Sequence, residues 1–216
     1  KSDIGLRIFA LRQLGQGKTH VRVTNLLFPQ AFVIPLSAEM TITQWHVPID
    51  DERCYWYAIF TSFTNPVQKE EMRRQRLLVY TLPDYMPRVG RFNDYGYDWK
   101  EQRQTTYTGM GEDINVHDQW AVESQGKIQD RTREHLGTTD KAIVAFRQLL
   151  REQLRKAAGG ERTLLQLEAA ESASVNGPGT MDGIGPSDAW QAYWQGVDQQ
   201  RRNQAPWRAQ RHHGAA

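Results

Sequence analysis

The chain has 216 residues, which is enough for one sizeable hydrophobic core. Its 27 lysines and arginines nearly balance its 25 aspartates and glutamates, so the charge gives no indication of nucleic acid or an anionic membrane as a partner. No apolar run approaches the roughly 20 residues of a membrane span, and the first residues lack a secretory signal, so the sequence predicts a soluble, cytoplasmic protein.

The single cysteine, Cys54, excludes internal disulfides and any cluster within this chain that needs two thiolates. It lies in an aromatic segment, which favours a place in the core over a role as a nucleophile. The chain begins at Lys1 without Met and enters a strand pattern at once. We therefore expect it to be one piece of a longer polypeptide.

Five segments alternate in the way that is typical of β-strands. They cover residues 4–11, 20–25, 32–34, 39–47 and 53–60. Turn residues separate them, as at Gly15-Gln16-Gly17. The pattern predicts an antiparallel meander of about four strands, and the many aromatic residues of the last segment favour the middle of the sheet.

Helical patterns follow the strands. Asn65-Pro66 predicts the start of a helix that continues to Tyr80. A polar segment over residues 97–106, helical or irregular, leads to a short helix that we expect to begin at Asp118. The last helix is long enough to lie across the sheet; it has Thr138 or Thr139 as its cap and the apolar positions Ile143, Phe146, Leu150 and Leu154.

Gly159-Gly160 is expected to end the compact part, which gives a catalytic-domain segment over residues 1–158 and a tail over residues 159–216. The tail has few branched aliphatic residues after Ser172, which predicts a flexible, low-complexity terminus. Two alternatives give its aromatic residues a role, either docking on a neighbouring subunit or making the chain an interaction protein. These residues are Trp190, Tyr193, Trp194 and Trp207.

Asp118 is the candidate functional residue. Ala121 and Val122 follow it at three and four positions, so the carboxylate shares a helical face with two apolar residues. Such a face is expected to point inward, where a carboxylate must be neutral, paired or bound to a metal. Glu123, five residues on, points elsewhere and is expected to have a different partner.

The six histidines do not complete a metal site with Asp118 by spacing alone. None forms a pair at one-turn spacing ahead of it. His46 is expected to be a hydrogen-bonded core or pocket-lining residue, His117 to be exposed, and His135 to lie near a helix end. The others are His20, His212 and His213.

Residues 118–126 and 128–140 resemble the C-terminal signature of the phthalate-dioxygenase group of Rieske non-haem iron ring-hydroxylating oxygenases. Residues 46–51, 93–95 and 107–109 resemble other segments of that group in the same order. The resemblance covers roughly residues 5–154. It implies an α+β fold of helix-grip (START/Bet v1-like) type, with an antiparallel sheet packed on a long C-terminal helix and incomplete at the N-terminus.

The resemblance also implies a chemistry. Asp118 matches the aspartate that, with two histidines, holds a mononuclear Fe(II), so it would be both a metal ligand and a catalytic residue. The histidine pair and the [2Fe–2S] Rieske cluster of this group would lie in a missing N-terminal part, and the chain alone is expected to be inactive. Electrons would come from NAD(P)H through a partner reductase.

The implied substrates are dioxygen and an aromatic acid or aryl ether, as in aromatic compound catabolism by dioxygenation, monooxygenation or demethylation. The implied assembly is a homo-oligomer of α subunits. The alternative hypothesis is an iron-free helix-grip module that binds an apolar ligand. Strand residues that would line a pocket, although core packing is the favoured interpretation for each, are His46, Trp45, Trp56 and Tyr57.

Overall fold

The computed structural model describes residues 1–175 and 177–209, so His212 and His213 lie outside the described residues. The chain divides into two compact units, one formed by Lys1–Val67 with His135–Ala216 and the other by Gln68–Glu134. Among the described residues, no helix is both long and apolar enough to cross a membrane.

The first unit contains an antiparallel meander. Its strands are β1 (Gly5–Gly15), β2 (Lys18–Leu27), β3 (Ala31–Pro35), β4 (Met40–Pro48) and β5 (Cys54–Ser62), and each pairs with the next. All five predicted segments are therefore strands. The prediction that the aromatic segment lies mid-sheet is wrong, because β5 ends the strand order and no described strand pairs with its outer edge.

A sixth strand, β8 (Met181–Pro186), joins the sheet from the C-terminal part of the chain. It pairs with residues 18–23 of β2, whereas β3 pairs with residues 25–27. Strand β1 pairs with β2 along one edge over its whole length. Strands β8 and β3 therefore both pair with the other edge of β2, one after the other.

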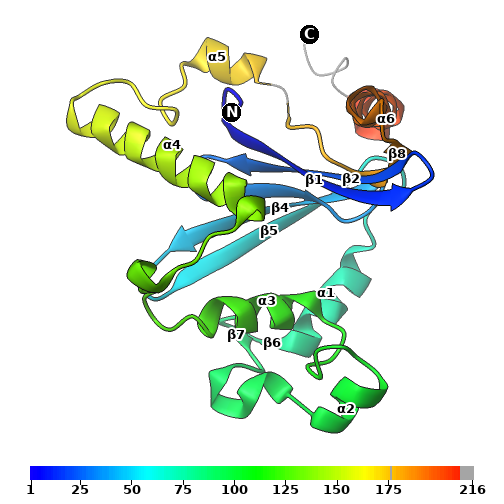
Figure 1. Cartoon of the computed structure of the whole chain (residues 1–216), viewed down its shortest axis with the longest axis vertical. Helices are drawn as coiled ribbons and strands as arrows, with labels where there is room; N and C mark the ends of the chain where they lie inside the picture. The colour runs from blue at the N-terminus through cyan, green and yellow to red at the C-terminus, as the bar shows by residue number, and fades with distance from the viewer. Residues whose placement is uncertain (176, 210–216) are drawn as a thin grey trace. The chain divides into compact units, whose positions relative to one another are not determined.

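Helix α4 (Lys141–Ala158) packs on the sheet through Leu149, which is 2% exposed and contacts Leu6 and Leu26. Figure 1 shows this helix lying along the sheet. The chain therefore has the expected α+β fold, an antiparallel sheet packed against a long helix in the helix-grip manner. Two of the predicted apolar positions, Ile143 and Leu154, are instead 42% and 59% exposed, because the contact runs along the neighbouring face of the helix.

Helix α6 (Trp190–Gln204) covers the opposite face of the sheet. Its Trp194 is 5% exposed and packs with Val21, Val23 and Met181. Val23 and Leu26 are three positions apart on one strand, so their side chains point to opposite faces. Figure 1 shows α6 beside β8.

The prediction that residues 159–216 form a flexible tail is therefore wrong for most of the described part. Aromatic rings replace the missing aliphatic side chains there: Phe9 lies 5.2 Å from Trp190 and 5.7 Å from Trp194, measured between ring centroids. The segment completes the sheet and buries one of its faces. The remaining elements of this unit are η3 (Thr138–Asp140), α5 (Ala169–Ser174) and α7 (Pro206–Ala209).

The second unit has little regular sheet. Its elements are α1 (Lys69–Val79), β6 (Tyr80–Thr81), β7 (Met86–Pro87), η1 (Arg91–Gly96), α2 (Trp99–Gln104), α3 (Ile114–Glu123) and η2 (Arg131–Arg133). Helix α1 begins later than Asn65-Pro66 predicts, because the backbone at Gln68 has a non-helical ψ of 83°. The fully buried hydrophobic side chains described in this unit are Tyr95 and Val116, so polar contacts contribute much of its order.

Candidate functional site

Asp118 lies in the middle of α3. The helix begins four residues earlier, because the Asp113 carboxylate caps it by accepting a hydrogen bond of 2.9 Å from the backbone N–H of Asn115. The same carboxylate pairs with Arg76 of α1 at 3.2 Å. The prediction that Asp118 begins the helix is therefore wrong, and α3 is fixed at its start by a different aspartate.

The buried side of α3 carries Val116, Gln119 and Glu123, which share one face at helical spacing. The Tyr95 hydroxyl donates to Glu123 Oε2 at 2.7 Å, and Gln119 Nε2 donates to Glu123 Oε1 at 3.0 Å. The expectation that Glu123 has a partner of its own is thus confirmed. Burial, together with the Glu123 carboxylate, raises the pKa of Tyr95, so its hydroxyl remains a donor at neutral pH.

Asp118 lies on the other side of the helix and is exposed. Ile114 and Val122 on that side are 63% and 68% exposed, and Ala121 is exposed as well. The expectation that Asp118 is buried beside Ala121 and Val122 is therefore wrong within this chain. Spacing gave the correct grouping of these residues, but the contact with Tyr95 turns the other face inward.

The Asp118 carboxylate makes no hydrogen bond or ion pair within the part of the chain that the structure describes. The acids at either end of α3, Asp113 and Glu123, are both paired. An unpaired carboxylate on an exposed, partly apolar helix face can coordinate a metal ion through its oxygen atoms. Over residues 1–175 and 177–209, no group of three or more metal-ligating side chains forms.

The described histidines are committed elsewhere or stand alone. His117 is half-buried, contrary to the prediction of exposure, because its Nε2 donates to the Gly111 carbonyl at 2.9 Å. His20 Nε2 lies 2.7 Å from Asp182 Oδ1. His46 is exposed, so the prediction that it lies in the core is wrong; its ring packs edge-on against Phe32, and desolvation lowers its pKa. His135 is exposed.

The aromatic residues predicted to line a pocket lie on β4 and β5 and are only partly buried. Trp45 and Trp56 are half-buried, whereas Tyr57 is 56% exposed, so core packing is wrong for Tyr57. Cys54 is exposed and not in the core, because it lies at the start of the edge strand β5.

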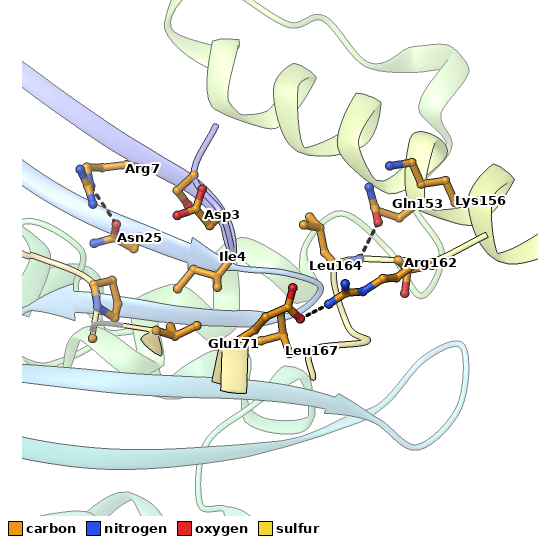
Figure 2. A pocket seen from close by; sticks show the side chains of 15 residues that line it. Asp3, Ile4, Arg7, Asn25, Gln153, Lys156, Arg162, Leu164, Leu167 and Glu171 are labelled. Atoms are coloured by element: carbon orange, nitrogen blue, oxygen red, sulfur yellow. Dashed lines mark hydrogen bonds and ion pairs between the residues drawn. The ribbon is translucent and has the colours of Figure 1, made fainter. Parts of the chain in front are cut away.

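A hollow of about 570 Å³ lies in the first unit between β1, the end of α4 and the segment leading to β8. Figure 2 shows two pairs among the side chains that line it, with Arg162 reaching Glu171 and Arg7 donating to Asn25 at 3.3 Å. These pairs occupy four of its polar side chains, and we assign no chemistry to this hollow.

Two comparisons with known proteins indicate the family of this chain. A sequence profile of the family described as LigXa C-terminal domain like matches residues 1–203, a range that includes β8 and most of α6. The phthalate 4,5-dioxygenase oxygenase subunit of Pseudomonas putida is 28% identical over 177 residues. That alignment covers 76% of this chain and 39% of the Pseudomonas protein, so the chain spans well under half the length of this curated relative.

Proposed function

This chain belongs to the LigXa C-terminal domain-like family, the catalytic domain of Rieske aromatic ring-hydroxylating oxygenases, and from that premise we propose that Asp118 is the carboxylate ligand of a mononuclear non-haem iron. The chain would then serve as part of an oxygenase α subunit. The subunit would insert oxygen derived from dioxygen into an aromatic acid or aryl ether.

The resemblance of residues 118–126 to the family signature carries this proposal, since it matches Asp118 to a metal-binding aspartate, and the Asp118 carboxylate has no partner among the described residues. An aspartate that only supported the fold would be expected to cap a helix or pair with a cation, as Asp113 does. Asp118 does neither, so its oxygens remain available.

The donor chemistry fits one arm of a site with two histidines and one carboxylate. The two imidazole arms would come from outside the described residues, since the described histidines do not gather around Asp118. When bound, the iron would supply dioxygen activation, with electrons from NAD(P)H through a reductase and a [2Fe–2S] cluster. Asp118 would hold the metal, and the paired acids of α3 would hold Asp118 in place.

The test is an Asp118→Asn substitution in the full-length subunit that carries this chain. Total iron would be measured per subunit by elemental analysis, and acid-labile sulfide would report the cluster iron to be subtracted. We expect mononuclear iron to fall at least tenfold and substrate-dependent oxygen uptake to disappear, while cluster iron is unchanged.

Glu112→Gln is the matched control, because Glu112 is an exposed acid just before α3. Full retention of mononuclear iron in Asp118→Asn would remove Asp118 from the site. Tight binding of an aromatic acid by wild-type subunit that holds no mononuclear iron would instead favour the iron-free binding module.

A further inference from the structure

One face of β3, β4 and β5 carries only uncharged side chains. Phe32 lies on this face and packs against the cluster that contains Leu149 of α4, so the face is turned toward that helix. Strand pairing places further residues on the same face in cross-strand rows. The first row is Gln30, His46 and Trp56, the second Phe32, Gln44 and Ala58, and the third Ile34, Ile42 and Phe60. None of these residues is a lysine, arginine, aspartate or glutamate, so the rows offer a ligand no permanent charge.

The first row lies at the open end of this face. Gln30 precedes β3 and continues its ladder, because its carbonyl accepts the His46 N–H at 3.1 Å. His46 is exposed, whereas Ile42 in the third row is 4% exposed. The rings of His46 and Phe32 meet edge to face, with centroids 5.9 Å apart. Aromatic and apolar side chains with a few polar groups are the usual lining of a small-molecule site. The open end therefore has the composition expected of a site for an aromatic ring.

The first row also contains enclosed polar atoms without a partner. Trp56 Nε1 and Gln30 Oε1 are both shielded from solvent, and neither makes a hydrogen bond among the described residues. Such unpaired groups are unfavourable and rare in native proteins, and a ligand that supplies the missing partner removes the cost. Side chains at binding surfaces commonly change rotamer on binding. A change of this kind would turn the Trp56 N–H toward a ligand oxygen.

His46 stands between these two residues in the row. Its ring nitrogens make no hydrogen bond within the part of the chain that the structure describes. Desolvation lowers its pKa, so the imidazole is neutral at pH 7 and has one donor and one acceptor nitrogen. These groups match the oxygen of a hydroxyl or an ether. A carboxylate placed here would lose water without gaining a cation from the face, which is unfavourable.

We propose that the open end of this face binds the aromatic substrate, and that Trp56 and His46 recognise an uncharged oxygen on it, a phenolic hydroxyl or an aryl ether, in preference to a carboxylate. The ring would pack against Phe32, and the Trp56 N–H would donate to the oxygen. A phenolic hydroxyl would also donate to His46, which an ether cannot do. This inference rests on the proposed function, because it concerns the substrate of the same subunit.

The test measures the Kd of phenol, anisole and benzoate for the full-length subunit by isothermal titration calorimetry. We expect phenol and anisole to bind about tenfold more tightly than benzoate. Trp56→Phe keeps a ring and removes the N–H, so it should weaken phenol and anisole about fivefold and leave benzoate unchanged. His46→Leu should weaken phenol more than anisole, which separates recognition of the hydroxyl from that of the ether.

Trp45→Phe is the matched control. Trp45 is the residue before His46 on β4 and pairs with Tyr57, so alternation turns its side chain to the opposite face of the sheet. All three Kd values should therefore equal those of the wild-type subunit. Equal weakening in Trp45→Phe and Trp56→Phe would reflect a general change in the sheet and would overturn the role of the Trp56 N–H.

Benzoate binding as tight as that of phenol and anisole in the wild-type subunit would overturn the inference. Unchanged Kd values in both Trp56→Phe and His46→Leu would do the same. Iron content tests the proposed function separately. If Asp118→Asn loses mononuclear iron and the order of affinities is not as expected, only the inference about this face fails. If Asp118→Asn keeps iron and the order holds, the ligand assignment of Asp118 fails and the binding face remains.

Discussion

Helices α3 and α6 each carry an aspartate in mid-helix, and the two aspartates have opposite surroundings. Asp198 of α6 is 8% exposed. Its Oδ1 accepts from Arg201 Nη2 at 2.6 Å, and its Oδ2 accepts from Arg202 Nε at 2.7 Å. Asp118 of α3 is exposed and unpaired within the described chain.

The contrast follows from what stands one turn later in each helix. Asp198 is followed at three and four positions by Arg201 and Arg202, and Asp118 by Ala121 and Val122. A carboxylate can be buried only where cations compensate its charge, and in α6 the helix itself supplies them. A carboxylate whose helix supplies only apolar neighbours must stay in water or find a ligand elsewhere.

Helix α6 also contacts other parts of its unit through Arg201. Arg201 donates to Thr180 Oγ1 at 2.6 Å, and its guanidinium lies 4.3 Å from the centroid of the Phe63 ring. Desolvation lowers the pKa of Arg201, while the Asp198 carboxylate opposes that shift. Arg201, which pairs with Asp198 inside α6, therefore also joins α6 to Thr180, the residue before β8.

The largest expected effect on stability comes from Asp198→Asn. It leaves the Arg201 charge buried without its counter-ion, which typically costs about 3–5 kcal/mol of unfolding free energy. Urea unfolding followed by far-ultraviolet circular dichroism measures the change. A loss below about 1 kcal/mol would show that the α6 aspartate is no more structural than the α3 aspartate, and the comparison would fail.

A smaller, pH-dependent effect is expected from Asp182, which joins β8 to β2. Partial burial would raise the pKa of Asp182, but hydrogen bonds from His20 and Arg22 outweigh it and hold the pKa below the ordinary value. The pKa of Asp182 is lower in the folded than in the unfolded state. The contribution of Asp182 to folding stability is therefore fully present above the unfolded pKa of about 4, and it is lost as the pH falls through the folded pKa.

Asp182→Asn should therefore lower stability by about 1 kcal/mol at pH 7 and make the melting temperature fall less steeply below pH 4. Thermal unfolding at a series of pH values measures both. Asp3→Asn, at an exposed aspartate of the same unit, is the control. A wild-type acid profile in Asp182→Asn would refute the role of this pair.

The smallest effect on stability is expected from Asp118→Asn, within about 0.5 kcal/mol of wild type, because the exposed carboxylate makes no contact to lose. The same urea experiment, done on metal-free protein, measures it. A loss comparable to that of Asp198→Asn would mean that Asp118 supports the fold, which would weaken its assignment as a metal ligand.

Much of the sheet could be predicted from sequence, because successive side chains of a strand point to opposite faces, and apolar and polar residues alternate where one face is buried. The α4 helix was found for the same reason, although its contact runs through Leu149 and not through Ile143. The position of β5 was missed, since aromatic content alone does not say whether a strand has one neighbour or two.

The largest miss was the C-terminal segment. A count of branched aliphatic residues predicts disorder there, but Trp194 packs against Val21 and Val23, which are distant in sequence. The Asp198 and Arg201 spacing was visible in the sequence, but the same spacing at Glu70 and Arg73 gives an exposed pair, so it does not by itself indicate burial. Local composition could not reveal that β2 had a free edge for β8.

The sequence by itself determined the strands and the long helix, since each depends on residues close together along the chain. Only the tertiary structure decided which face of α3 is held and where the C-terminal segment goes. Those outcomes depend on contacts such as Tyr95 with Glu123 and Met181 with Val23, which join residues that no local pattern links.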